Sequence, residues 1–258
     1  MYTRFPSLIV KTGSAGGGSY DSDAQAFFTG ANITDTTEKN AWNTFVNSAK
    51  SAGYYSKFYG FWPILGGTSS TCSYNAINTS AFPIIWEGSP DFTSAGVKSN
   101  SVSDYGGTAG DFDISAEGWT STNSMLGYYS STPMNANELA IADASFQSHI
   151  AGYSGTQGQL SIGGISDFVS KSYTNGCCIL NNHTGVKKYY HQGTERVTFT
   201  GTAVYYSGGI IILGDGGTFY YSSGRMSAVF VGDGFTSTEI SNFQTHIQTF
   251  QTALGRNV

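Results

Sequence analysis

Hydrophobic and polar residues are spaced at helical intervals near the start of the chain. Over residues 42–49 the apolar side chains stand at i, i+3, i+4 and i+7, which places them on one face of a helix. Asp35 and Glu38 before them have the spacing of a capping box, in which the Glu38 side chain reaches back to the cap. A shorter helical pattern covers 21–28. Residues 21–67 are therefore predicted to be a helical entry segment.

From residue 54 onward the alternation of apolar and polar residues has a period of two. Turn residues recur at roughly eight to twelve positions, which is typical of a β-sandwich or barrel and not of βαβ units. Because so many strands overfill one open sheet, we expect a mostly β fold with two facing antiparallel sheets, a sandwich over 68–258. The expected strands are 82–86, 110–114, 125–130, 138–143, 146–151, 159–162, 177–181, 185–190, 194–206, 209–213, 218–221 and 226–231.

The end of the chain has the pattern of an amphipathic helix. Gly232-Asp233-Gly234 is a tight-turn sequence, and Thr236 and Glu239 after it have the spacing of a second capping box. The apolar residues that follow recur at helical spacing over about four turns, with Gln and Thr on the other face. A helix over 237–254 is therefore predicted to close the sandwich.

Composition and charge limit the classes of function. At 258 residues the chain is about as long as one hydrophobic core supports, so one main domain is expected. The net charge of -5 argues against nucleic-acid binding, because phosphate neutralisation needs clustered Lys and Arg. The apolar run at the N-terminus is too short for a signal peptide, and none approaches the ~18 apolar residues of a membrane span. We expect a chain made in a cytoplasm, without membrane insertion.

The first residues have the composition of a separate arm. Residues 12–19, TGSAGGGS, are typical of a flexible linker. Residues 1–20 are therefore predicted to be an arm and linker, in which Met1 to Val10 can dock independently on a partner.

The sequence predicts no cofactor and no metal site. Cys72, Cys177 and Cys178 are odd in number and two are adjacent, which favours three free thiols packed as small apolar side chains over disulfides or zinc ligands. The turns 214–217 and 232–234 offer one carboxylate each, whereas calcium takes six or more oxygen ligands. The four histidines are scattered, and a surface or hydrogen-bonded position is expected for each.

Asp111, Asp113 and Glu117 are the sharpest catalytic candidates in the chain. Sandwich glucanases place acidic residues at alternate strand positions, so that their carboxyl groups enter one groove. The glucanase pattern resembles E-x-D-x-x-E, whereas here Asp stands in the first place and one extra residue precedes Glu117. We therefore favour a strand start that runs into an exposed turn, and we predict that the chain is not an enzyme. A carbohydrate-active hydrolase that uses this stretch is the alternative.

Tyrosine doublets are a further feature of the sequence. In a strand, one ring of each doublet would point inward and the other outward. Outward rings would form a surface for stacking on sugars or for protein contact, because Tyr combines a large apolar area with a polar tip. Ordinary cross-strand pairing explains the doublets equally well. The expected binding residues are Tyr128, Tyr129, Tyr189, Tyr190, Tyr205 and Tyr206.

Three segments of the chain resemble a group of bacteriophage virion proteins, usually fibre-like or tail-associated. Residues 23–67, from DAQAFFTGANITDTTEKNAW to GFWPILGG, look like the helical entry segment of that group. Residues 226–258, MSAVFVGDGFTSTEISNFQTHIQTFQTALGRNV, look like its closing strand, GDG turn and final helix. Residues 126–145, LGYYSSTPMNANELAIADAS, are similar to its sheet core, where the family has a concanavalin A-like, laminin-G-like jelly roll.

This resemblance implies a virion structural protein made in the host cytoplasm. Such a protein is a tail fibre, a tail-associated module or a capsid decoration, which acts by protein contact and by binding a host surface glycan. It also implies a homo-oligomer, a trimer by analogy with symmetric fibres, and other virion proteins as partners, reached through Met1 to Val10. The matching motifs are caps, turns and core strands, so they bear on fold more than on function. A free lectin is a third interpretation.

Overall fold

The computed structural model describes residues 19–258 except 101–102, 109–111, 134, 136–137, 205–207 and 215–220. In this part of the chain, two antiparallel sheets and a set of helices make up the fold. The α-helices are α1 (Ser22–Gly30), α2 (Thr36–Ser51), α3 (Ser69–Cys72) and α4 (Ser237–Ala253).

The first sheet, sheet A, has the strand order β13-β12-β11-β6-β15-β4-β3, and β1 also pairs with β15. The second, sheet B, has the order β10-β9-β8-β7-β14-β5-β2. Sheet A contains β1 (Phe58–Trp62), β3 (Asp91–Thr93), β4 (Gly96–Lys98), β6 (Asn123–Ser130), β11 (Gly176–His183), β12 (Val186–His191), β13 (Thr194–Phe199) and β15 (Arg225–Gly232). Sheet B contains β2 (Ile84–Glu87), β5 (Tyr105–Thr108), β7 (Leu139–Asp143), β8 (His149–Gly152), β9 (Gln157–Ile162), β10 (Ile165–Ser170) and β14 (Ile210–Ile212).

These sheets confirm the predicted class, a mostly β, two-sheet antiparallel sandwich with a helical segment near the N-terminus and a helix at the C-terminus. The expected strand at 110–114 is wrong where it can be compared, because residues 112–118 form a loop and a turn. The strands β1, β3, β4, β5 and β10 were not expected. The first of these belongs to the predicted entry segment, 21–67, which therefore contributes a strand to sheet A as well as helices.

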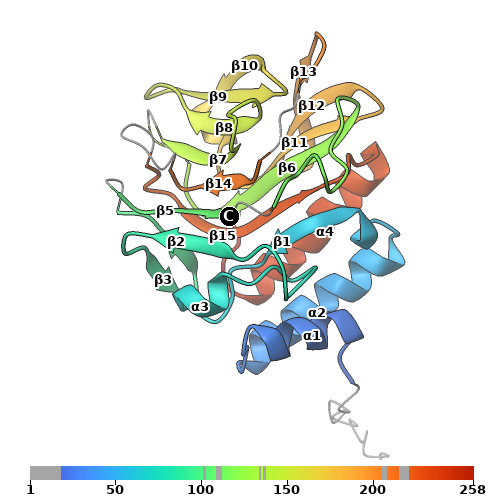
Figure 1. The fold of residues 1–258 in the computed structure, drawn as a ribbon, viewed down its shortest axis with the longest axis vertical. Coiled ribbons are helices and arrows are strands. Elements are labelled where there is room, and N and C mark those ends of the chain that lie inside the picture. The colour runs from blue at the N-terminus through green and yellow to red at the C-terminus, as the bar shows by residue number, and fades with distance from the viewer. Residues whose placement is uncertain are drawn as a thin grey trace, which may run out of the picture.

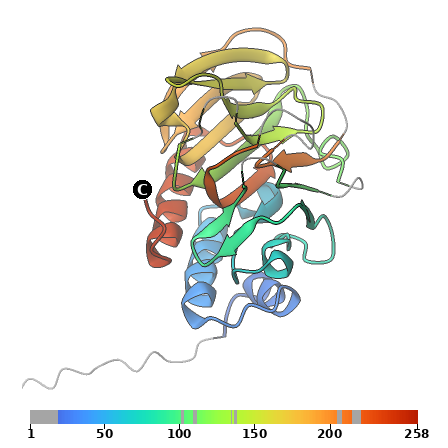
Figure 2. The same cartoon turned by 90° about the vertical axis from the view of Figure 1, so that its left-hand side faces the viewer.

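The helices turn the sandwich into three layers. Figure 1 shows α1, α2 and α4 together on one side of the sheet that contains β15, β6 and β11, while β7 to β10 lie on the other side. Figure 2, turned by 90°, shows α2 and α4 side by side against this sheet. The apolar stripes of the two helices account for this position, because each stripe must be buried against another apolar surface. Their aromatic rings pack together: the ring centroids of Trp42 and Phe250 lie 5.6 Å apart.

The central strands of sheet A, β6, β11 and β15, are consequently buried on both faces. One hydrophobic cluster fills the space between the helices and sheet A, and a second fills the space between the two sheets. Adjacent residues of a central strand belong to different clusters: Cys177 faces the helices and Cys178 faces sheet B. Both thiols and that of Cys72 are free and buried, which confirms the prediction for the cysteines. Burial raises the pKa of Cys178 to about 12, so this thiol is unreactive at neutral pH.

The two predicted capping boxes have different outcomes. At the start of α4 the box is complete, because the Glu239 amide donates to Thr236 Oγ1 at 3.2 Å and the Thr236 amide donates to Glu239 Oε2 at 2.7 Å. At the start of α2 only half of the box forms: Asp35 accepts a hydrogen bond from the Glu38 amide at 2.9 Å. The Glu38 carboxylate instead accepts from the Gly66 amide at 3.1 Å, and so ties the helix to the segment after β1.

Among the residues that the structure describes, no helix combines the length and the apolar character needed to cross a membrane.

Candidate functional site

The tyrosines predicted to bind a ligand lie in the core. Tyr128 and Tyr189 are fully buried between the two sheets, whereas Tyr129 and Tyr190 are buried between sheet A and the helices. The expectation that each doublet has an outward ring is therefore wrong for these four residues, because the helices cover the face that was expected to meet solvent. Tyr205 and Tyr206 lie outside the described residues.

The polar tips of these rings are used inside the fold. The Tyr128 hydroxyl donates to the Thr174 carbonyl at 2.7 Å, and the Tyr189 hydroxyl donates to the Tyr173 carbonyl. The Tyr129 hydroxyl donates to Gln248 Oε1 on α4 at 3.2 Å. A buried hydroxyl needs such a partner, so these tyrosines act as structural residues between the layers.

The acidic stretch that was the sharpest catalytic candidate forms a local turn. Asp113 accepts hydrogen bonds from the Ser115 amide at 2.9 Å, the Ser115 hydroxyl at 2.7 Å and the Gly208 amide at 3.3 Å. The Ser115 hydroxyl and these amides lower the pKa of Asp113. Glu117 is exposed in the same turn, and Asp111 lies outside the described residues. The exposed turn expected around Glu117 is confirmed, whereas the strand start expected at Asp113 is wrong, because residues 112–118 form a loop and a turn.

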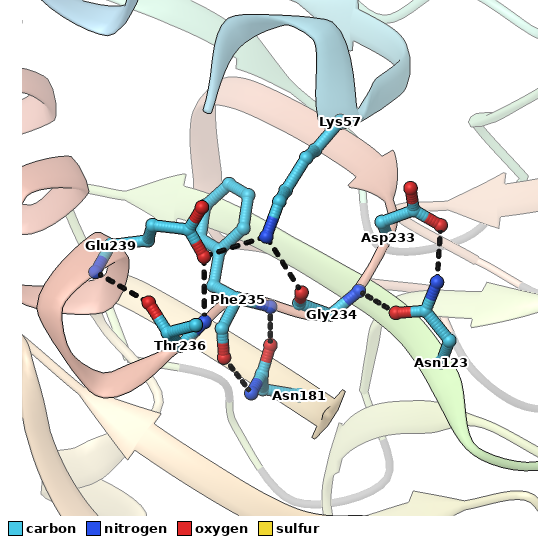
Figure 3. A network of polar contacts seen from close by, with 8 residues as sticks. All are labelled: Lys57, Asn123, Asn181, Asp233, Gly234, Phe235, Thr236 and Glu239. Carbon is cyan, nitrogen blue, oxygen red and sulfur yellow. Dashed lines mark hydrogen bonds and ion pairs between the residues drawn. The ribbon is translucent and has the colours of Figure 1, made fainter. Parts of the chain in front are cut away.

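The turn at 232–234, considered above for calcium, belongs to a network that fastens α4 to sheet A (Figure 3). Asn123 donates to Asp233 Oδ1 at 2.6 Å and accepts from the Gly234 amide at 2.8 Å. Asn181 binds both backbone groups of Phe235, donating to its carbonyl at 2.9 Å and accepting from its amide at 2.7 Å. The Asp233 carboxylate is thus occupied by side chains of the protein.

Lys57, the residue before β1, completes this network. Its Nζ lies 2.7 Å from Glu239 Oε2, on the carboxylate that also caps α4 (Figure 3). Elsewhere, the other turn considered for calcium, 214–217, lies outside the described residues except for Gly214. Over the part of the chain with described positions, no three His, Cys, Asp or Glu residues gather in a way that could hold a metal ion.

The outer face of sheet B, which the helices do not cover, carries a row of side chains across four strands. In the strand register, Leu139 of β7 lies opposite Ala151 of β8, Ala151 lies opposite Gln159 of β9, and Gln159 lies opposite Phe168 of β10. Their inward neighbours, such as Leu160, belong to the core between the sheets. The row therefore presents small and apolar groups at one end, an amide in the middle and an aromatic ring at the edge.

A pocket of about 320 Å³ lies on this row, which we call the sheet B pocket. Its size is at the lower end of the range for small-ligand sites. The lining residues are Leu139, Phe146, His149, Ala151, Gly152, Tyr153 and Gln159.

Exposed aromatic rings border the sheet B pocket. Tyr153 is 52% exposed, Phe168 is 42% exposed, and their ring centroids lie 4.7 Å apart. Phe146, at 38% exposed, adds a third ring from the turn between β7 and β8. Large apolar side chains that stay in water over a sheet are a feature of interaction sites when they gather in one place. The sheet B pocket is therefore the best candidate for a functional site.

The turn that carries Phe146 is held in a costly conformation. Phe146 has a φ of 57°, in the left-handed region that a bulky residue seldom adopts. The buried Asp143 side chain fixes the turn, accepting from the amides of Ser145 at 3.0 Å, Gln147 at 3.0 Å and Ser148 at 2.6 Å. Such a conformation costs on the order of 1–3 kcal/mol, and the hydrogen bonds to Asp143 hold it in place.

Two polar side chains of the pocket can exchange hydrogen bonds with a ligand. His149 Nδ1 lies 3.1 Å from the Phe146 carbonyl, which can only accept, so Nδ1 carries the proton and Nε2 is the acceptor of the neutral ring. Burial lowers the pKa of His149, which keeps the ring neutral at pH 7. The Gln159 side chain makes no hydrogen bond to the described residues, and its amide offers both a donor and an acceptor.

Comparisons with known proteins identify the fold. No protein-family model and no curated protein matches the chain. Domain 4 of AbnA, an extracellular GH43 arabinanase from Geobacillus stearothermophilus solved in complex with arabinotriose, matches with a TM-score of 0.51 at 11% identity, over 72% of this chain and 98% of that chain. Trypanosoma rangeli sialidase in complex with sialic acid matches with a TM-score of 0.55 at 10% identity, over 82% of this chain but only 39% of the sialidase chain. At such identities the likeness establishes a shared β-sandwich fold.

These matches contradict one prediction. From the absence of a recognisable catalytic constellation we predicted that the chain is not an enzyme. The solved structures that share its fold include a domain of an arabinanase and part of a sialidase, which are glycoside hydrolases. The prediction is therefore wrong: this fold occurs in chains of carbohydrate-active enzymes, so neither the fold nor the missing motif excludes enzymatic kinship.

Proposed function

We propose that this chain is a glycan-binding β-sandwich domain that holds a sugar in the sheet B pocket. The observation that carries the proposal is the exposed pair of Tyr153 and Phe168 beside the free amide of Gln159. Sugars present apolar C–H faces that stack on aromatic rings, and hydroxyl groups that need donors and acceptors at defined positions. The pocket offers both kinds of contact.

The arabinanase domain supports the same proposal from another direction. It is a domain matched over 98% of its own length, and it was solved with arabinotriose bound. A sandwich of this architecture can therefore hold an oligosaccharide, and arabinotriose is a suitable first ligand for this chain.

Removing single rings tests the proposal. Isothermal titration with arabinotriose and a survey on a glycan array would identify a ligand, and Tyr153→Ala and Phe168→Ala would then be compared with the wild type. We expect each variant to bind at least tenfold more weakly, about 1.4 kcal/mol, because each removes one stacking ring. Ile85→Ala is the matched control, since Ile85 is 50% exposed on β2 at the opposite edge of sheet B. Equal binding by the wild type and both ring variants would refute the pocket as the site.

Glycan hydrolysis is the second candidate function, favoured by the arabinanase and sialidase matches. Glycosidases use a pair of carboxyl groups, about 5–9.5 Å apart, and the described residues that line the sheet B pocket include no Asp or Glu. Incubation with arabinan and with sialylated oligosaccharides, followed by measurement of released reducing ends and sialic acid, tests for activity. Because Asp113 is committed to its own turn, we expect any cleavage to survive Asp113→Asn.

We further propose, from the sequence resemblance, that the chain performs this binding as a fibre-like, tail-associated or decorating component of a bacteriophage virion. A host surface glycan would then be its ligand and other virion proteins its partners. Attachment through Met1 to Val10, a segment outside the described residues, and assembly as a homotrimer are parts of this proposal. Labelling the protein in imaged phage particles tests its placement, and light scattering that shows a monomer at micromolar concentration would count against the trimer.

A further inference from the structure

The lining residues of the sheet B pocket that the structure describes are all uncharged at pH 7. Among its described lining residues there is no Lys, Arg, Asp or Glu, and the polar atoms come from the Gln159 amide, the His149 ring and the Tyr153 hydroxyl. The His149 ring does not supply a positive charge at pH 7, because its pKa is lowered by burial. A ligand in this pocket would therefore meet dipoles and aromatic faces.

A negative charge lies close to the pocket. The Asp143 carboxylate lies beneath the turn that presents Phe146, and its charge acts on His149, which lines the pocket. The cation of the neighbouring segment, Lys171, donates to Asn135 Oδ1 at 3.0 Å. Asn135 in turn binds the Glu138 carboxylate, with its Nδ2 at 2.9 Å from Glu138 Oε1, so that Lys171 is drawn toward an existing negative charge.

We infer that the sheet B pocket selects neutral sugars and rejects those that carry a carboxylate, such as sialic acid and the uronic acids. This inference rests on the proposed function, since it names the class of glycan that the same site accepts. Proteins bind a sugar carboxylate through Arg or Lys, most strongly through the paired donors of Arg. In this pocket a carboxylate would lose water, gain no cation from the described lining residues and lie near the Asp143 charge, and an unpaired charge is costly to desolvate.

A glycan array with matched triplets tests the inference on the full chain. Each triplet contains a neutral oligosaccharide, its sialylated form, and a form of equal length extended by a neutral sugar, which separates the effect of charge from that of size. We expect binding to neutral members of the array, at least tenfold weaker binding to their sialylated forms, and no loss of the neutral signal when NaCl is raised from 50 to 500 mM. We also expect Tyr153→Ala to weaken binding of the neutral members at least tenfold.

Two other results would overturn the inference in different ways. Sialylated members that bind as well as or better than the neutral ones, with a signal that falls as salt rises, would show that the pocket or its rim recognises a negative charge. The proposed glycan-binding function would survive that result. If no member of any triplet binds, or if the signal is unchanged in both Tyr153→Ala and Phe168→Ala, the pocket is not the sugar site and both proposals fall.

Discussion

Replacing Asn181 by alanine tests how the final helix is fastened to the sandwich. The Asn181 side chain is buried in β11 and makes two hydrogen bonds to the backbone of Phe235, at 2.9 and 2.7 Å, one residue before the cap of α4. Phe235 is itself buried, at 1% exposed, so water cannot replace the lost partners. The substitution leaves one buried amide and one buried carbonyl without a hydrogen bond.

The magnitude follows from these two groups. An unsatisfied buried donor or acceptor costs about 1–3 kcal/mol, so Asn181→Ala should lower the free energy of unfolding by about 2–5 kcal/mol. That is a large part of the ~5–15 kcal/mol by which domains are stable. With an m value of about 3 kcal/mol/M, the midpoint of urea unfolding should fall by roughly 1 M.

Urea unfolding followed by tryptophan fluorescence measures this shift. The matched control is Asn47→Ala, because Asn47 is exposed on α2 and its side chain donates, from Nδ2, to the Asn43 carbonyl at 3.0 Å within the same helix. We expect the control to change stability by less than about 0.5 kcal/mol. If Asn181→Ala shifts the midpoint no more than Asn47→Ala does, the network of Figure 3 does not secure the helix as argued here.

Three further predictions concern other parts of the fold. Gly127→Ala should lower the free energy of unfolding by more than about 3 kcal/mol, because an added Cβ would lie 2.3 Å from the Phe230 ring. Gly155→Ala should be neutral, because the space around Gly155 is open. Thermal melts that fail to separate the two variants would refute this prediction. Arg256→Ala should lower the free energy of unfolding by about 2–4 kcal/mol, because the buried guanidinium donates to backbone carbonyls at 2.6 and 3.1 Å. Arg256→Lys should restore little of this loss. A melting temperature of Arg256→Ala equal to that of the wild type would contradict the prediction. Burial lowers the pKa of His191, so the unfolded chain takes up a proton below about pH 6.5 that the folded chain does not. The free energy of unfolding should therefore fall as the pH drops from 7 to 5, and it should fall less in His191→Phe.

Local patterns in the sequence were sufficient for the caps and for most of the strands. Thr236 and Glu239 make the predicted capping box because both partners lie within four residues, so that no distant contact decides the outcome. Glu38 has the same spacing from its cap, but its carboxylate binds the Gly66 amide. That contact joins residues 28 apart, and local spacing contains no information about it.

The tyrosine doublets show where the sequence interpretation failed and what signal was available. A period of two places Tyr128 and Tyr129 on opposite faces, but it does not say whether each face meets water or another layer. The helices supply that information: the apolar stripes of α2 and α4 each need a surface to cover, and the outer face of sheet A is the one they occupy. Central strands with nearly continuous apolar residues, such as Met226–Val231, also indicate burial on both faces.

The residues of the sheet B pocket could not be found from the sequence. Tyr153 and Phe168 are separated in the chain and meet only because β9 and β10 pair in a particular register. The strand β10 was missed because it is a mostly exposed edge strand with a polar composition, which carries a weak alternation signal. No motif links a single tyrosine after one strand with a single phenylalanine in another.

The three-layer arrangement also has a consequence for how the chain can change over evolution. Two of the faces in the sandwich meet each other and a third is covered by helices, so substitutions there disturb packing that is shared between layers. On the outer face of sheet B, by contrast, side chains near the β10 edge such as Tyr153 and Phe168 are exposed, so they can be exchanged at little cost to folding. New ligand preferences can therefore arise at that edge while the rest of the molecule stays constant, and lineages that share this architecture should differ most along β9 and β10.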